Sequence, residues 1–157
     1  MTDAAFWDKI APKYAKNPIT DMNNYRATLD RIKAILQPHH RVLEIGCGTG
    51  STALELADGV DRYIGTDAST GMIKIAQAKI QKDAPEHLRF AVHAAEDMPA
   101  APHDVILALN LLHLVPNLEE VFDRTYEALP SGGLFIAKTP LLKDCLLYTS
   151  PSPRDRG

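Results

Sequence analysis

The residues best suited to bind a ligand are three glycines at every second position. Gly46, Gly48 and Gly50 follow a short apolar segment that contains Glu44. Glycines after a buried strand allow a ligand to approach the backbone closely. A phosphate-binding loop needs a lysine and then Ser or Thr after its last glycine, whereas here Gly50 is followed directly by Ser51. The spacing therefore disfavours a phosphate-binding loop.

The loop also differs from the G-x-G-x-x-G pattern of dinucleotide-binding folds. Its third glycine, Gly50, comes one residue early, and Ser51 occupies the dinucleotide position. Residues 43–57 include no Lys or Arg, but they include Glu44 and Glu55. Acidic groups repel a pyrophosphate and attract a cation. The pattern favours a positively charged ligand and leaves a nicotinamide-dependent oxidoreductase as the less favoured alternative.

S-adenosylmethionine is a ligand of this kind, because its sulfonium and ammonium are positive and it carries no phosphate. Its ribose has two free hydroxyls, and one carboxylate can accept hydrogen bonds from both. Such a carboxylate belongs at the end of the second strand, where Asp67 stands. The analogous acid of dinucleotide folds lies roughly 20 residues beyond the glycines. The sequence therefore predicts S-adenosylmethionine as cofactor, with Asp67 on its ribose.

Alternating apolar strands and amphipathic helices must position these groups. Such an alternation predicts a parallel α/β sheet with right-handed crossovers. Ligands of such sheets bind beyond the carboxyl ends of the strands, at the switch point beside the first strand, which is where the glycine loop falls. An amphipathic helix over residues 25–36 precedes the sheet. The expected strands are 41–45, 61–67, 88–94, 104–109 and 134–139, and the expected helices are 51–57, 70–83 and 117–129.

The composition narrows the class of protein. The 157 residues allow one domain, and the net charge of −3 gives no indication of a nucleic-acid or membrane partner. The most apolar window, residues 104–115, is too short to span a bilayer, and the first residues do not resemble a signal peptide. Cys47 and Cys145 offer neither a disulfide framework nor the spacing of a metal site. We therefore expect a cytoplasmic protein without a structural metal.

Five segments in this order resemble the class I S-adenosylmethionine-dependent methyltransferases of the small-molecule type, including those similar to quinone-biosynthesis C-methyltransferases. The segment at residues 6–19 also resembles the N-terminal part of such enzymes. The resemblance implies a three-layer Rossmann-like methyltransferase sheet with strand order 3-2-1-4-5 and N-terminal helices. The matching segments are EIGCGTG (44–50), Asp67, AAEDMP (94–99), HDVILALNLLHLV (103–115) and LPSGGLFIAKTP (129–140).

The resemblance also implies the part that each matching residue plays in binding the cofactor. The loop residues would face the methionine portion, Glu44 would hold the ammonium, and Gly50 would bring the next helix close. Asp67 would bind the ribose, with the adenine beside the residues after it and after the third strand. Tyr14 would belong to a lid. The implied cofactor-binding residues are Tyr14, Glu44, Gly46, Cys47, Gly48, Gly50, Asp67, Ala68, Met72, Ala95, Glu96, Asp97 and Leu109.

Methyl transfer is an in-line displacement in which alignment and exclusion of water supply most of the catalysis. A general base is needed only where the acceptor must first lose a proton. Asn110 and His113 are the candidates for a catalytic group, although neither stands in a motif that requires one. Asn110 lacks the N-P-P-Y context of amide and adenine methylation. We expect a small-molecule acceptor, with a cofactor-binding protein that lacks transferase activity as the alternative.

The chain divides into a leader at 1–40, a cofactor-binding core at 41–140 and a tail at 145–157. The tail reads CLLYTSPSPRDRG and closely resembles the translated read-through of a sequencing adapter. This resemblance implies a non-native tail and a family fold whose last strands are missing. We then expect the strand at 134–139 to be an exposed edge that is prone to pair with other chains. We also expect the truncation to impair the activity of the chain.

Overall fold

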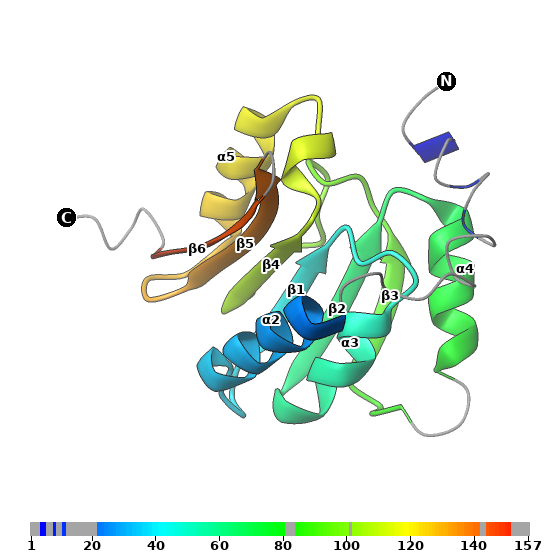
Figure 1. Cartoon of the computed structure of the whole chain (residues 1–157), viewed down its shortest axis with the longest axis horizontal. Coiled ribbons are helices and arrows are strands. Elements are labelled where there is room, and N and C mark those ends of the chain that lie inside the picture. The colour runs from blue at the N-terminus through cyan, green and yellow to red at the C-terminus, as the bar shows by residue number, and fades with distance from the viewer. Residues whose placement is uncertain are drawn as a thin grey trace.

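One mixed sheet of six strands organises the chain, in the order β3-β2-β1-β4-β5-β6 (Figure 1). The computed structural model describes residues 4, 5, 8, 11, 22–80, 84–100, 102–141 and 144–151. The elements are α2 (Met22–Ile35), β1 (Arg41–Ile45), α3 (Ser51–Leu56), η1 (Ala57–Gly59), β2 (Arg62–Asp67), α4 (Thr70–Lys79), β3 (Leu88–Val92), β4 (Val105–Leu109), η2 (Leu112–Leu114), α5 (Leu118–Ala128), β5 (Leu134–Leu141) and β6 (Asp144–Pro151).

The first five strands are parallel. Their order in the sheet confirms the predicted strand order 3-2-1-4-5. β1 pairs with β2 on one side and with β4 on the other. The chain leaves β1 toward β2 and later returns to β4, so the connections diverge at the carboxyl end of β1. Divergence of this kind opens a crevice in doubly wound sheets. The glycine loop, directly after β1, lies at that point.

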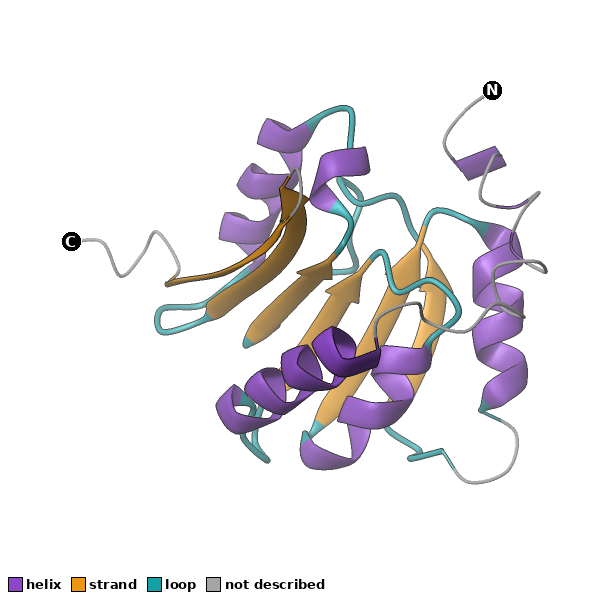
Figure 2. Cartoon of the chain, viewed as in Figure 1, coloured by secondary structure: helices purple, strands orange, loops and turns teal. Residues whose placement is uncertain are grey.

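Helices cover both faces of the sheet, and each face has its own apolar core. Leu29 of α2, Ala53 of α3 and Ile73 of α4 belong to one buried cluster. Val121 and Ala128 of α5 belong to the other. In Figure 2, α2 and α3 lie in front of the strands. The expected three-layer arrangement is therefore present in the described residues.

The alternation of side chains along the strands explains these two cores. In β1, Val42 belongs to the cluster under α2 and α3, while Leu43 and Ile45 belong to the cluster under α5. In β4, Leu107 belongs to the cluster under α2 and α3, and Ile106 belongs to the cluster under α5. Successive strand residues point to opposite faces, so a strand covered on both faces must be apolar throughout. The near-continuous apolar run of β4 is the result.

The sheet continues one strand beyond the predicted edge. β5 pairs with β6 in antiparallel register, from Leu134↔Pro151 to Leu141↔Asp144, and the two strands lie side by side in Figure 1. The expectation of an open edge at β5 is therefore wrong. A strand ladder uses the N–H and C=O groups that nearly every residue carries, so a segment without hydrophobic periodicity can still pair. A foreign origin of residues 145–157, and the three-part division of the chain, stay predictions.

The described residues include neither a helix suited to a membrane nor a cluster suited to a metal ion. None of the helices there has both the length and the apolar character needed to cross a membrane. Within the same residues, no group of three or more His, Cys, Asp or Glu side chains is arranged to hold a metal ion.

Candidate functional site

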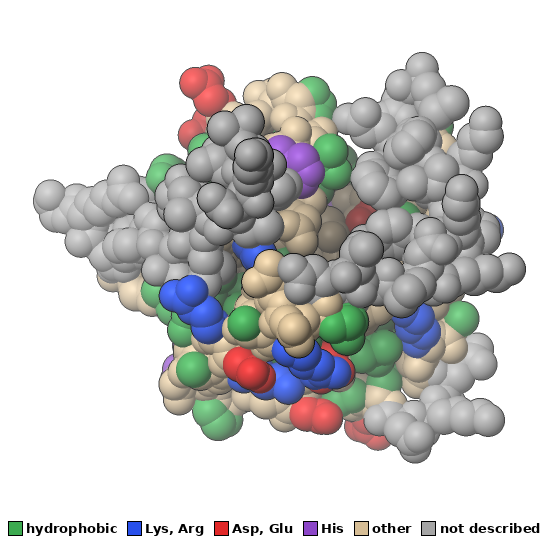
Figure 3. Space-filling view, viewed as in Figure 1, with side chains coloured by type: hydrophobic (Ala, Val, Ile, Leu, Met, Phe, Trp, Pro, Cys, Tyr) green, Lys and Arg blue, Asp and Glu red, His purple; other side chains and the backbone are tan. Residues whose placement is uncertain are grey.

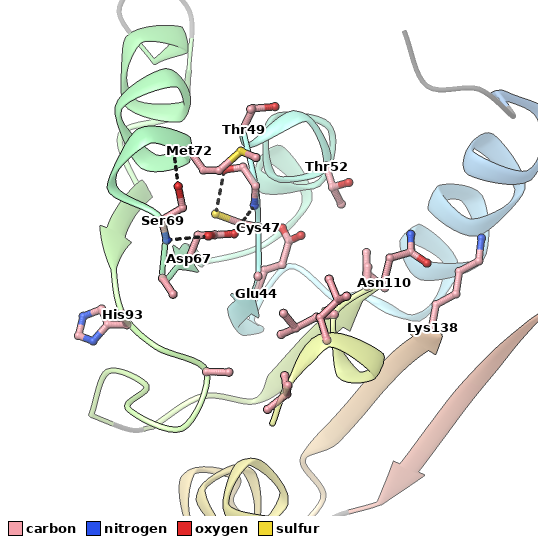
Figure 4. A pocket seen from close by; sticks show the side chains of 18 of the residues that line it. Glu44, Cys47, Thr49, Thr52, Asp67, Ser69, Met72, His93, Asn110 and Lys138 are labelled. Carbon is pink, nitrogen blue, oxygen red and sulfur yellow. Dashed lines mark hydrogen bonds between the residues drawn. The ribbon is translucent and has the colours of Figure 1, made fainter. Parts of the chain in front are cut away.

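A cavity of about 710 Å³ lies at the carboxyl ends of the strands. This volume is within the range of sites for small molecules and cofactors. Figure 4 shows its lining side chains, with Asp67 and Met72 at one end and Asn110 and Lys138 at the other. The lining includes residues that follow β1, β2, β3 and β4, together with residues of α2 and β5. The cavity therefore occupies the predicted switch point.

The glycine loop forms the floor of this cavity. Gly46, Gly48 and Gly50 have φ angles of 71°, 58° and 84°, in the left-handed region that favours glycine. A Cβ on Gly48 would meet no atom within 4 Å, whereas a Cβ on Gly46 would lie 2.8 Å from Leu111 Cδ1. Gly46 and Gly48 both line the cavity. A ligand can therefore approach the backbone of Gly48 directly.

Gly50 does not line the cavity, and its contribution is to packing. It precedes the first residue of α3. A Cβ at this position would lie 2.6 Å from Phe90 Cζ and 3.1 Å from Ala76 Cβ. Because there is no side chain at Gly50, α3 can begin close to β3 and α4.

We expect Gly50→Ala to destabilise the protein more than Gly132→Ala. Gly132 also has a positive φ, of 83°, but a Cβ there would meet nothing within 4 Å. Left-handed strain should cost about 1 to 2 kcal/mol at either site, and overpacking against Phe90 should add about 1 to 3 kcal/mol at Gly50. Urea unfolding of both variants measures the difference. Equal losses would contradict the packing role of Gly50.

Asp67 closes the loop from the neighbouring strand. Its Oδ2 accepts a hydrogen bond from the backbone N–H of Gly48 at 2.9 Å, and its Oδ1 accepts one from Ser69 N–H at 2.9 Å. Burial raises the pKa of the Asp67 carboxyl, while these two N–H groups act in the opposite direction. Each carboxylate oxygen can accept more than one hydrogen bond. The side chain therefore lies against the glycine junction and retains acceptor capacity for two ligand hydroxyls.

Glu44 is the second carboxyl group of the cavity lining. Its side chain is 3% exposed, and the Tyr63 hydroxyl donates a 2.6 Å hydrogen bond to Oε1. Burial raises the pKa of Glu44 to about 7, against the lowering effect of the Tyr63 hydrogen bond and with a smaller contribution from the charge of Asp67. The charge on Glu44 therefore changes near neutral pH. A cation in the cavity would stabilise its ionised form.

Cys47 acts through its backbone. Its N–H donates a 2.8 Å hydrogen bond to the Thr66 carbonyl, which ties the glycine loop to β2. The side chain is 7% exposed, and burial raises the pKa of the thiol well above its usual value. A buried thiol that stays protonated is a poor nucleophile. Cys47 therefore belongs to the cavity lining as a small loop residue rather than as a reactive one.

A basic side chain reaches the glycine loop from outside the predicted segment. Lys79 Nζ, at the end of α4, donates hydrogen bonds to Thr49 Oγ1 at 3.3 Å and Ser51 Oγ at 3.4 Å. Lys79 does not line the cavity. Sequence analysis missed this neighbour because the contact depends on how α4 packs against α3. The ligand-facing side of the loop retains its acidic character from Glu44 and Asp67.

The structure brings most of the predicted site residues to the cavity, but it leaves some outside. Asp97 is exposed and does not line it; its carbonyl accepts a 2.8 Å hydrogen bond from His93 Nδ1. His113, on η2, is exposed and also lies outside the lining. Tyr14 lies outside the described residues. The predicted residues that line the cavity are Glu44, Gly46, Cys47, Gly48, Asp67, Ala68, Met72, Ala95, Glu96, Leu109 and Asn110.

The leader contacts the site through a residue that sequence analysis missed. Asp8 Oδ1 accepts 2.6 Å hydrogen bonds from the Ser69 hydroxyl and the Gly71 N–H, at the first turn of α4. These contacts, the Gly71 N–H first, lower the pKa of Asp8. Ala4 lines the cavity as well. No spacing signal in the sequence links residue 8 to residues 69–71, because the contact is made by tertiary packing alone.

The far end of the cavity was also missed. Tyr25 and Thr28 of α2 line it together with Lys138 of β5. Lys138 Nζ donates a 2.7 Å hydrogen bond to Thr28 Oγ1, and the Tyr25 hydroxyl lies 3.1 Å from Thr52 Oγ1. Lys138 follows the apolar part of a predicted strand at its carboxyl end. The rule that ligands bind at such ends could have identified it.

Comparison with known proteins places these features in a family. An alignment 140 positions long covers 83% of the chain and is 30% identical to the equisetin synthetase eqxS of Fusarium heterosporum, of which it spans 4%. Over 99 residues the chain is 31% identical to the uncharacterized methyltransferase YcgJ of Bacillus subtilis, covering 62% of this chain and 39% of that protein. The chain thus spans less than half the length of either relative.

Solved structures agree with this comparison. The YcgJ crystal structure superposes with a TM-score of 0.68 at 27% identity, over 73% of this chain and 50% of that one. The Haemonchus contortus phosphoethanolamine N-methyltransferase 2, in complex with S-adenosyl-L-methionine, has the same fold, with a TM-score of 0.74 at 22% identity over 88% of this chain and 36% of that one. Residues 42–133 match the family model for the methyltransferase domain. Because that match covers more than half of the chain, the chain belongs to the class I methyltransferase family.

Proposed function

We propose that this chain transfers a methyl group from S-adenosylmethionine to a small-molecule acceptor. The observation that carries the proposal is the Asp67 carboxylate held against Gly48, below open space in a cavity of about 710 Å³. A carboxylate in this place suits ribose hydroxyls and repels phosphate. The buried Glu44 adds a second acid that suits a cationic ligand. The residues present therefore fit the cofactor that the family uses.

The cofactor would lie along the cavity from β3 toward β4. Asp67 would accept hydrogen bonds from the ribose hydroxyls, and Glu44 would attract the ammonium of the methionine portion. The backbone of Gly48 would face the same portion, since a Cβ there would meet no protein atom. The adenine would contact lining residues beyond β2 and β3. Those residues are Ala68, Met72, Ala95 and Glu96.

The residues after β4 would align the acceptor. S-adenosylmethionine, when bound, supplies a methyl group on a sulfonium that departs as a neutral thioether. Leu109, Asn110 and Leu111 line the cavity where this group would sit. Leu111 packs over Gly46, because a Cβ on that glycine would lie 2.8 Å from Leu111 Cδ1. An apolar wall at this point excludes water, and alignment without water is what an in-line displacement requires.

The surface charges support an acceptor other than nucleic acid. The net charge is −3. Over α2 and α3, Lys and Arg side chains stand beside Asp and Glu side chains (Figure 3). Arg26 and Lys33 both pair with Glu55, at 3.2 and 3.6 Å. Nucleic-acid binding depends on unpaired basic groups that displace counterions. A cytoplasmic location stays a prediction of the sequence.

Binding and transfer can be tested separately. We expect calorimetric titration to show binding of S-adenosylhomocysteine and none of NAD, because the loop lacks dinucleotide spacing. We also expect label from [methyl-³H]S-adenosylmethionine to appear in an organic extract when small-molecule acceptors are supplied. Binding without transfer to any acceptor would favour a cofactor-binding protein that lacks transferase activity. Binding of NAD in place of S-adenosylhomocysteine would overturn the proposed function.

A further inference from the structure

The cavity has a basic corner at the end opposite Asp67. Lys138 lies in β5, which pairs with β4 through Leu109↔Lys138. Asp67 ends β2, and the order β2-β1-β4-β5 separates the two residues by three strand spacings, about 14 Å. The ribose site is on β2 and the glycine loop follows β1. A cofactor placed over these two strands leaves Lys138 on the acceptor side.

From this arrangement we propose that the acceptor is an amphipathic acid whose anionic oxygen is bound by Lys138. The inference rests on the proposed function and specifies the substrate class of the same site. The anionic oxygen is that of a carboxylate. A neutral group of the same shape would bind more weakly, because its hydrogen bond from the ammonium lacks the attraction between two opposite charges.

Two contacts fix the position of the lysine. Lys138 Nζ donates a 2.7 Å hydrogen bond to Thr28 Oγ1, and an ammonium has three donors. The Lys138 carbonyl accepts a 2.6 Å hydrogen bond from Asn110 N–H. Figure 4 shows the Asn110 and Lys138 side chains pointing the same way, toward α2. Asn110, Thr28 and Lys138 therefore form one polar corner of the cavity.

The backbone at Asn110 supports a functional corner. Asn110 has a φ of 58°, and within the described part of the chain it is the non-glycine residue in the left-handed region. Asn tolerates this conformation better than most residues, and strained positions of this kind cluster at ligand sites. The conformation turns the chain directly after β4, where the acceptor would meet the methyl group.

The charge of Lys138 is not neutralised by a described carboxylate. The ion pairs among the described side chains join Arg26 and Lys33 to Glu55, Arg41 to Asp104 and Arg124 to Glu127. Lys138 takes part in none of these pairs. Its ammonium is therefore placed to attract an anion that enters the cavity.

An apolar wall stands beside the polar corner. Leu111, Leu114 and Val115 line the same cavity on the segment that contains η2. Leu114 is 40% exposed, and few large apolar residues in the described part of the chain are as exposed. Apolar surface next to a single cation suits a ligand with an anionic head and a hydrocarbon chain. This combination distinguishes an amphipathic acid from a small polar anion such as phosphate.

Octanoate and octanamide are matched probes, because they share a chain and differ in charge. The full chain, saturated with S-adenosylhomocysteine, is titrated with each probe by ligand-observed NMR. We expect octanoate to bind at least tenfold more tightly than octanamide. Lys138→Met should reduce octanoate affinity by about tenfold or more, as for loss of a hydrogen bond to a charged group, and should reduce octanamide affinity by a clearly smaller factor. Lys138→Arg should retain the preference for octanoate.

Lys33→Met is the matched control, since Lys33 is an exposed residue of α2 paired with Glu55 and lies outside the cavity lining. It should alter neither probe's affinity. Circular dichroism melts check that each variant is folded. Equal affinities of octanoate and octanamide for the wild-type chain would overturn the proposal. So would an unchanged octanoate affinity in folded Lys138→Met.

The carboxylate of the cofactor is the other anion that Lys138 could bind, and a separate experiment tests this alternative. If Lys138 bound that group, Lys138→Met would weaken the binding of S-adenosylhomocysteine. It would not change the affinity for 5′-methylthioadenosine, which lacks the carboxylate. This outcome would overturn the assignment of Lys138 to the acceptor. Failure of the wild-type chain to bind S-adenosylhomocysteine would refute the proposed function instead. The octanoate and octanamide titrations, repeated without that ligand, would then still decide the role of Lys138.

Discussion

Asp67→Asn is expected to weaken binding of S-adenosylhomocysteine by about 100-fold, or about 3 kcal/mol. Hydrogen bonds to a charged group contribute about 1.5 to 3 kcal/mol each, and the ribose would make two. Both oxygens of Asp67 also accept backbone hydrogen bonds, from Gly48 and Ser69. An amide offers one oxygen, so its NH₂ would face one of these N–H donors. Isothermal titration calorimetry measures the affinity directly.

Asp97→Asn provides the control for this experiment. Asp97 is an acid from the adenine-side motif, but it is exposed and lies outside the cavity lining. We expect the affinity of Asp97→Asn for S-adenosylhomocysteine to stay within about twofold of the wild-type value, because exposed charges at a distance are screened. Thermal melts of both variants establish that they remain folded. An unchanged affinity in folded Asp67→Asn would refute the ribose assignment.

The affinity for S-adenosylmethionine is expected to rise with pH up to about pH 7. Burial raises the pKa of Glu44 to about 7 in the free protein. A bound cation favours the ionised form, so binding releases a proton wherever Glu44 is protonated beforehand. Between about pH 5.5 and pH 7 this linkage should increase the affinity about tenfold, and above pH 7 the gain should level off. Titrations in two buffers of different ionisation enthalpy measure the proton release.

Glu44→Gln separates this effect from other titrating groups. Gln keeps an oxygen that can accept from the Tyr63 hydroxyl but has no charge to titrate. The variant should bind the cofactor with little pH dependence over the same range. Parallel pH profiles for the variant and the wild type would rule out Glu44 as the linked group.

The same carboxyl should make the free protein less stable as pH rises. The ordinary pKa of Glu44 is 4.5, and its folded value is about 7, so the folded state binds more protons between these values. Stability therefore falls as pH rises from about 4.5 through about 7, by about 3 kcal/mol in total. Urea unfolding at a series of pH values should show a larger decline in the wild type than in Glu44→Gln. A wild-type midpoint that changes in parallel with the variant's would contradict this origin.

Local pattern was sufficient to predict the sheet and one end of the site. The two-sided burial of β4 appears in the sequence as a continuous apolar run, and alternation with helices predicts parallel strands. The strand order 3-2-1-4-5 was implied by the family resemblance. The general rule for ribose acids predicted the position of Asp67 at the end of β2 beside the glycine loop, and that position is confirmed; its role on the ribose stays a proposal. Each of these inferences depends on residues close in sequence or on a general rule of the fold.

The sequence pattern did not predict the contacts between elements that are distant in the chain. Tyr63 bonds to Glu44 only because the register pairs Val42 with Tyr63 and Glu44 with Gly65. Lys138 reaches Thr28 across 110 residues. β6 forms through backbone pairing, which leaves little trace in side-chain type. Register, helix docking and edge pairing are properties of the packed chain.

One residue, Ser69, joins the leader to the sugar site. Its N–H is held by Asp67, while its hydroxyl is held by Asp8. Ser69 also caps the N-terminus of α4, since its hydroxyl oxygen accepts a hydrogen bond from the Met72 N–H. Any force that pulls residue 8 away from α4 is therefore transmitted to Asp67, the carboxylate that we propose for the ribose. An affinity tag fused ahead of the leader should disturb cofactor recognition more than one fused at the opposite end of the chain.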